Sequence, residues 1–146
     1  MGAQLSDGLL LDNSAWTRLA HPSLSVTRSD EIANAVESGL VFASLPFLLE
    51  AGYSARNLQE HGELIDELLA LPWAAIDQEV ERRAIDAQGQ LARAGHHRMP
   101  PVDVLLAALA ERYELGVLHY DHDYDVLAAR TDLDFSSVWL VQPSSL

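Results

Sequence analysis

Short apolar runs separated by segments of helical character are the feature that most constrains how this chain can fold. The runs cover residues 9–11, 40–43, 117–120 and 138–141, with a weaker candidate at 73–76. An alternation of this kind predicts a parallel sheet, because each strand reaches the next through a helix that covers one face. We therefore expect an α/β fold with helices on both faces of the sheet.

Capping signals mark the ends of the helices between these runs. Ser29, followed by two acidic residues, predicts a helix start, and Gly39 predicts the end of that helix. Further helices are expected over residues 44–53, 57–71, 78–94 and 101–113, and in a short segment that ends at Arg130. The segments 44–53 and 57–71 are predicted to form a helical hairpin.

Size and composition favour one domain spanning residues 1–146. The chain is 49% hydrophobic, which is enough to bury a core, and no apolar run reaches the roughly 18 to 20 residues of a membrane span. Residues 1–7 lack the basic and apolar regions of a signal peptide, so a cytoplasmic protein without membrane contact is expected. The chain has no cysteine, which excludes a disulfide framework, a thiolate zinc site and a cysteine nucleophile.

The net charge bears on which ligands the chain can bind. Nine basic residues, all arginine, face 22 acidic residues, for a net charge of −13. This charge repels a polyanion such as RNA, unless several carboxylates hold divalent cations where phosphate must bind. The exclusive use of arginine fits bidentate phosphate contacts and a compositional bias equally well.

Four carboxylates occupy positions from which they can meet. Asp12 follows the first strand and Asp121 follows the strand 117–120, so both lie at the same edge of a parallel sheet. Asp103 is in the first turn of a helix opened by Pro101. Glu50 interrupts an apolar helical segment, where a lone carboxylate is costly unless it has a partner.

Each of these acids also has an ordinary structural explanation. Asp12 can cap a helix, although Ser14 is an alternative cap that would leave Asp12 free. Asp103 complements the positive end of a helix dipole, and Glu50 can occupy an exposed position on a short amphipathic helix. Asp121, with Asp123 and Asp125, can belong to a solvated turn. Together, however, the acids form a set of oxygen ligands that suits Mg²⁺, which activates water and offsets charge on a leaving 3′ oxygen.

Other metal sites fit the sequence poorly. The triplet Asp121, Asp123 and Asp125 does not start a calcium loop, because Val126 stands where glycine is needed and Asp132 where glutamate is needed. The histidines 96, 97, 119 and 122 lack the i, i+4 spacing of a zinc-protease site. Residues 96–98 are expected to form either a substrate-facing loop or a plain exposed one.

Four motifs, taken in order, resemble the PIN domain of VapC-type toxins. They are Leu-Leu-Leu-Asp12-Asn13-Ser14, then Glu50, then Arg98-Met-Pro-Pro-Val-Asp103, and then His119-Tyr-Asp121-His-Asp123-Tyr-Asp125. The resemblance spans nearly the whole chain. It implies a PIN-like parallel sheet and an endoribonuclease that uses Mg²⁺, for which Mn²⁺ can substitute. It also implies a homodimer and a VapB-type antitoxin whose C-terminal part covers the acidic groove.

The resemblance also assigns roles by position. Asp12, Glu50, Asp103 and Asp121 would form the catalytic acidic quartet, and Asp123 would be a further metal ligand. Ser14 would support Asp12. Apart from the resemblance, the place of Arg98 in the loop of residues 96–98 makes it a candidate to lie near the substrate. The family commonly has Thr where this chain has Asn13 and often Phe where it has Tyr124, but neither departure removes a carboxylate.

Other protein classes fit the sequence less well than a toxin nuclease. A response-regulator receiver and a haloacid-dehalogenase phosphatase both need a lysine, and this chain has none. A PIN fold kept only as a binding module predicts a broken quartet, whereas all four positions are filled. A PIN-domain nuclease that acts in RNA maturation remains an alternative. Only the small size of this chain favours a toxin over such a nuclease.

Overall fold

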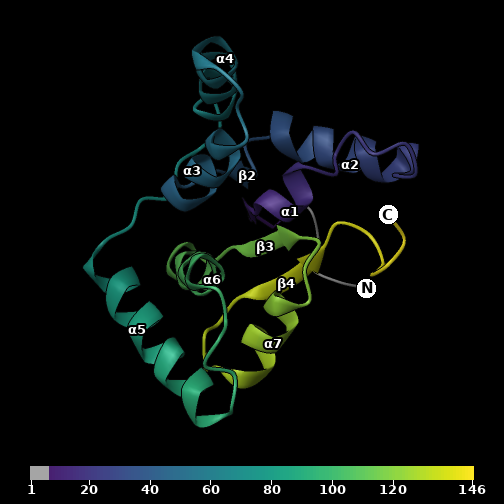
Figure 1. Cartoon of the computed structure of the whole chain (residues 1–146). Helices are drawn as coiled ribbons and strands as arrows, with labels where there is room; N and C mark the ends of the chain where they lie inside the picture. Colours follow the sequence, from purple (N-terminus) through teal and green to yellow (C-terminus); the bar gives the residue numbers. More distant parts are fainter. Residues whose placement is uncertain (1–6) are drawn as a thin grey trace.

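A parallel sheet forms the centre of the molecule (Figure 1). The structure is a computed structural model that describes residues 7–146. Within this range the sheet has the strand order β2-β1-β3-β4, and all three pairings are parallel. The strands are β1 (Leu9–Leu11), β2 (Val41–Phe42), β3 (Gly116–His119) and β4 (Ser136–Trp139). The predicted α/β class is therefore confirmed.

Helices cover both faces of this sheet (Figure 1). They are α1 (Asn13–Trp16), α2 (Val26–Glu37), α3 (Leu45–Tyr53), α4 (Leu58–Leu68), α5 (Gln78–Arg93), α6 (Pro101–Tyr113) and α7 (Asp123–Arg130). Helices α1 to α4 pack on one face, and α5 to α7 pack on the other. The expected hairpin is present as the neighbouring helices α3 and α4.

Strand β1 consists of three leucines and does not alternate with polar residues, because both of its faces are buried. Leu10 is buried in the core beneath α5, α6 and α7, whereas Leu9 and Leu11 are buried in the core beneath α1 to α4. Successive strand residues point to opposite faces, so a strand covered on both faces needs an apolar side chain at every position. This central position also places the end of β1 in the middle of the sheet edge.

The predicted ends of the elements are partly correct. Gly39 and Gly95 follow α2 and α5 with φ values of 72° and 84°, as expected for residues that end helices. The prediction that Ser29 starts α2 was wrong: the helix begins at Val26, and the Ser25 hydroxyl accepts a hydrogen bond of 3.1 Å from the Arg28 amide.

Two predicted strands also differ from the structure by more than one residue at an end. The candidate at residues 73–76 is reduced to one isolated bridge between Trp73 and Ala43. The last strand lies at residues 136–139 rather than 138–141, because it pairs along β3 from Gly116 to His119. Among the helices of residues 7–146, none has the length and apolar character needed to cross a membrane.

Candidate metal centre

Two acids lie side by side where the central strands end. Leu11 of β1 pairs with Leu118 of β3, and the next amide, that of Asp12, donates a hydrogen bond of 3.0 Å to the Leu118 carbonyl. Asp121 follows two residues after the end of β3. The structure thus confirms that both acids lie at one edge of the sheet, which is where parallel sheets bind ligands.

Asp103, Asp121 and Asp123 form a compact group of carboxylates. One oxygen from each lies within 4.8 Å of the others. Asp103 is in the first turn of α6, and Asp123 is the first residue of α7, where its amide donates a hydrogen bond of 2.9 Å to Asp121 Oδ1. Three carboxylates at this spacing offer the hard oxygen ligands that Mg²⁺ and Mn²⁺ prefer.

The Tyr124 hydroxyl joins Asp12 to this group. The side chain is fully buried, and its hydroxyl lies 2.7 Å from Asp12 Oδ1 and 3.2 Å from Asp103 Oδ1. A phenol has one proton, so it donates fully to only one of the two, and the shorter distance favours Asp12. Sequence reasoning did not place Tyr124 in the site. The signal was present, because this chain has tyrosine where the resemblance favours phenylalanine.

Ser14 contacts the other oxygen of Asp12. Both the amide and the hydroxyl of Ser14 donate hydrogen bonds to Asp12 Oδ2, and the one from the amide is 2.9 Å long. The same hydroxyl accepts a hydrogen bond of 2.8 Å from the Tyr120 amide of the loop after β3. Asp12 itself is the N-cap of α1, so Ser14 does not replace it in that role. Asp12 is therefore oriented from both sides.

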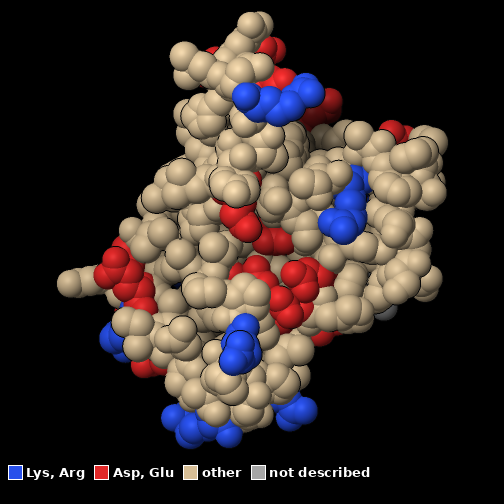
Figure 2. Space-filling view, in the orientation of Figure 1, with Lys and Arg blue, Asp and Glu red and all other residues tan. Residues whose placement is uncertain are grey.

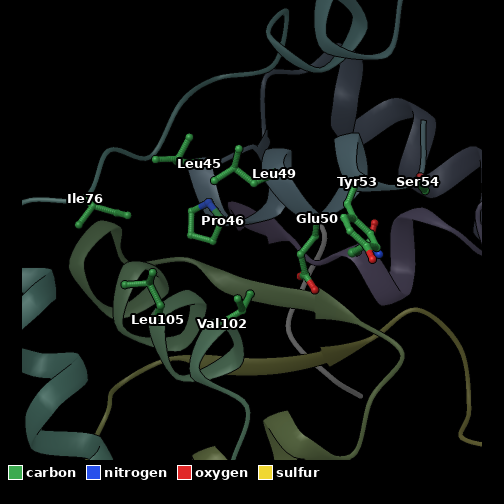
Figure 3. A pocket seen from close by; sticks show the side chains of 10 residues that line it. Leu45, Pro46, Leu49, Glu50, Tyr53, Ser54, Ile76, Val102 and Leu105 are labelled. Carbon is green, nitrogen blue, oxygen red and sulfur yellow. The ribbon is translucent and has the colours of Figure 1, made fainter. Parts of the chain in front are cut away.

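Glu50 lies at the border of the group and is not one of its three closely spaced acids. It is exposed on α3, and Figure 3 shows its carboxylate extending from α3 toward the side on which Val102 of α6 lies. Partial burial, and then the charge of Asp12, raise its pKa, so this carboxylate is electrostatically coupled to the site.

An apolar pocket of about 640 Å³ adjoins Glu50 (Figure 3). Helix α3 contributes Leu45, Leu49 and Tyr53 to its wall, and α6 contributes Val102 and Leu105. The exposed fractions of Leu49 and Tyr53 are 65% and 91%, which is unusual for apolar and aromatic side chains that share one groove.

The acids of the centre raise one another's pKa values. Burial, then a hydrogen bond to Asp123 and the charges of its neighbours, raise the pKa of Asp103 to about 8. Burial and the charges of Asp123 and Asp12 also raise the pKa of Asp121.

In residues 7–146 none of these acids is paired with an arginine. Figure 2 shows acidic side chains gathered in the middle of the face in view, with basic side chains above, to the right of and below them. A bound cation would supply the missing positive charge.

His119 has a structural place beside the site. It is fully buried, its Nδ1 accepts a hydrogen bond of 3.1 Å from the Asp121 amide, and its Nε2 lies 2.7 Å from the Ser137 hydroxyl. Because Nδ1 is an acceptor, Nε2 carries the proton of the neutral ring. Burial lowers the pKa of His119 to about 4, so the ring stays neutral and orients the Asp121 backbone.

The loop at residues 95–100 lies next to the acids. His96, His97 and Arg98 line a small cleft of about 270 Å³ together with Asp123. The loop therefore adjoins Asp123, and its contact with a substrate stays a prediction. Within residues 7–146 the group of candidate metal ligands consists of aspartates and includes no histidine.

Comparison with known proteins agrees with this geometry. A model of the PIN domain matches residues 9–130. Ribonuclease VapC2 of Mycobacterium tuberculosis is 38% identical over 130 residues, which cover 84% of this chain and 86% of the relative. Ribonuclease VapC51 of the same organism is 38% identical over 122 residues, with the same two shares covered. A DNA-bound VapBC structure from Salmonella typhimurium has a TM-score of 0.72 at 16% identity, covering 92% of this chain and 99% of that chain, and so supports the fold. This chain belongs to the PIN domain family, among the VapC ribonucleases.

Proposed function

We propose that the protein is a metal-dependent endoribonuclease toxin that hydrolyses RNA phosphodiester bonds, with Mg²⁺ as the ion and Mn²⁺ as a substitute. The observation that carries the proposal is the group of carboxylates formed by Asp103, Asp121 and Asp123. The Tyr124 hydroxyl connects this group to Asp12, and in residues 7–146 no basic side chain pairs with these acids. The relatives named as ribonucleases support RNA as the substrate. The whole chain, residues 1–146, is proposed to act as one domain.

The proposed roles follow from where the acids lie. Asp12, Asp103, Asp121 and Asp123 would hold the cation, and Glu50 would complete the site from the α3 side. When bound, the ion activates a water molecule and offsets charge on the leaving oxygen. Ser14 and Tyr124 fix the two oxygens of Asp12, so this carboxylate needs little reorganisation to bind the ion.

Proton binding at Asp103 competes with the cation. Its pKa of about 8 means that the metal-free protein keeps a proton at this carboxyl near neutral pH. Cation binding must displace that proton, because a carboxylate binds metal in its ionised form. Metal affinity is therefore expected to rise with pH up to about 8.

The proposed partner is a VapB-type antitoxin, because the Salmonella typhimurium structure of similar fold is one of VapBC bound to DNA. Apolar anchors of such a partner would fit the pocket lined by Leu45, Leu49 and Tyr53. The neighbouring Glu50 and the acids beyond it would then accept an Arg or Lys that takes the place of the cation. The proposed setting is the cytoplasm, with the toxin as a homodimer.

The function is tested by incubating the purified protein with total RNA and sequencing the 5′ ends of the products. Cleavage is expected with Mg²⁺ or Mn²⁺ and not in excess EDTA. Asp103→Asn should abolish it, whereas the matched control Asp66→Asn, an exposed position on α4, should not. Undiminished cleavage by Asp103→Asn or in EDTA contradicts the proposal.

The antitoxin mechanism needs a separate test. The protein is co-purified with the product of a small adjacent gene, and Mg²⁺ is titrated into the complex. Relief of inhibition by Mg²⁺ supports competition between the ion and a basic side chain. Inhibition that ignores Mg²⁺ and survives removal of every basic residue from the antitoxin tail shows that the antitoxin acts by steric cover alone.

A further inference from the structure

Arg18, just after α1, has no carboxylate partner among residues 7–146, although the chain is strongly acidic. Ion pairs in residues 7–146 involve Arg28, Arg56, Arg82, Arg83 and Arg112. Arg18 instead donates a hydrogen bond of 2.8 Å from Nη1 to the Ser14 carbonyl. Its guanidinium carbon lies 4.7 Å from the centroid of the Tyr120 ring. The side chain is half-buried, so these contacts hold it in place.

The groups that hold Arg18 are the ones that build the metal centre. Ser14 bonds to Asp12, and its hydroxyl accepts a hydrogen bond from the Tyr120 amide. Tyr120 directly precedes Asp121, and its own hydroxyl accepts a hydrogen bond of 2.9 Å from the Leu146 amide. The position of the guanidinium is therefore tied to Asp12 and Asp121 through short, rigid connections.

One edge of the guanidinium remains available. Among residues 7–146, no acceptor bonds to Nε or Nη2 of Arg18, because its hydrogen bonds to Ser14 and Thr17 both use Nη1. The Nε and Nη2 hydrogens lie side by side and match two oxygens of one phosphate. In Arg83 the same edge binds the carboxylate of Glu111, at 2.8 and 3.0 Å.

We propose that Arg18 is a phosphate-binding residue, which binds an RNA phosphate next to the one cleaved at the metal centre through its Nε and Nη2 edge. The inference rests on the proposed ribonuclease function. Cations held by the acids offset charge only locally, so the flanking phosphates still meet a chain of net charge −13. A fixed arginine beside the acids would lower that repulsion and set the register of the strand.

The test measures binding of a labelled single-stranded RNA of about 12 nucleotides by fluorescence anisotropy, from about 25 to 250 mM KCl. Ca²⁺ replaces Mg²⁺ to prevent cleavage. Arg18→Gln should weaken binding about fivefold or more at low salt, and it should reduce the slope of log affinity against log salt by about 0.7, the value for one phosphate contact on a single strand. The matched control is Arg93→Gln, the same loss of charge at an exposed position in the last turn of α5. This control should bind like the wild type.

Arg18→Lys separates charge from geometry. It keeps the positive charge but lacks the two-hydrogen edge, so it should keep the salt slope and still lose affinity. Melting curves establish that each variant is folded, and Arg18→Lys serves as the main test if Arg18→Gln is not.

The inference is overturned if Arg18→Gln binds RNA like Arg93→Gln, or if Arg18→Lys binds like the wild type. A cleavage assay distinguishes failure of this inference from failure of the proposed ribonuclease function. If the wild type cuts RNA and the Arg18 variants are unaffected, only the role of Arg18 is wrong. If the wild type neither binds nor cuts RNA, both proposals fall.

Discussion

Replacing Asp103 with Asn should stabilise the metal-free protein while removing its proposed activity. Burial and the neighbouring carboxylates raise the pKa of Asp103 from 3.8 to about 8. Between these two values the folded chain binds a proton that the unfolded chain has lost. The stability of the metal-free wild type must therefore fall as the pH rises through this window.

The size of the effect follows from the same shift. The unfolded chain gains free energy by ionising this carboxyl while the folded chain keeps it protonated, which lowers the stability by on the order of 4 kcal/mol at pH 7 and by much less at pH 4. Asn removes that cost, but its amide fits the hydrogen bonds of the site less well, which offsets about 1 to 2 kcal/mol. A net gain of about 2 kcal/mol at pH 7 corresponds to roughly 4 to 8 °C in Tm for a domain of this size.

The assay is thermal unfolding in EDTA at pH values between about 5 and 8, within the window set by the two pKa values. The difference in Tm between Asp103→Asn and the wild type should grow steadily with pH across this range. Asp66→Asn, which removes an exposed acid of α4, should follow the wild type at every pH. A difference that is constant with pH, or that changes sign toward the alkaline end, refutes the electrostatic reasoning.

Three further predictions concern the centre and its framework. Tyr124→Phe should lower the Mg²⁺ affinity measured by calorimetry about tenfold, because it removes the hydroxyl that joins two of the acids. The control Tyr113→Phe, whose hydroxyl bonds to a carbonyl away from the site, should leave the affinity unchanged. Equal Mg²⁺ affinities of the two variants would contradict this prediction. Millimolar Mg²⁺ should raise the Tm and EDTA should reverse the rise, and an unchanged Tm would count against a metal site. Arg83→Met should lower the free energy of unfolding in urea by about 1 kcal/mol, because it leaves the half-buried Glu111 without its ion pair. A loss below about 0.3 kcal/mol would show that solvent already screens this pair.

The sequence was sufficient for the sheet and for the positions of most acids. Asp12 and Asp121 follow buried strands that are neighbours in a parallel sheet, and Pro101 sets the start of the helix that carries Asp103. These features depend on local patterns, namely apolar runs, a proline and strand ends, so they can be read without tertiary contacts. The roles of these acids remain predictions until the variants are measured.

Features that depend on distant contacts could not be predicted. Helix α2 begins at Val26 rather than near Ser29, and Arg28 in its first turn bonds to the carbonyls of Trp139 and Leu140, which are far away in the sequence. The apolar character of α3 suggested burial around Glu50. In the structure one side of this helix instead faces an open groove, and no local pattern distinguishes a groove from a core.

The position of β1 between two cores has a consequence for how the protein unfolds. Leu10 packs under one layer of helices, and Leu9 and Leu11 pack under the other, so neither layer can separate from the sheet without exposing leucines of the same strand. The two halves should therefore lose their structure cooperatively, in one transition that fluorescence and circular dichroism report at the same denaturant concentration. Truncating Leu10 alone should lower the stability of both halves together, including the layer that its side chain does not contact.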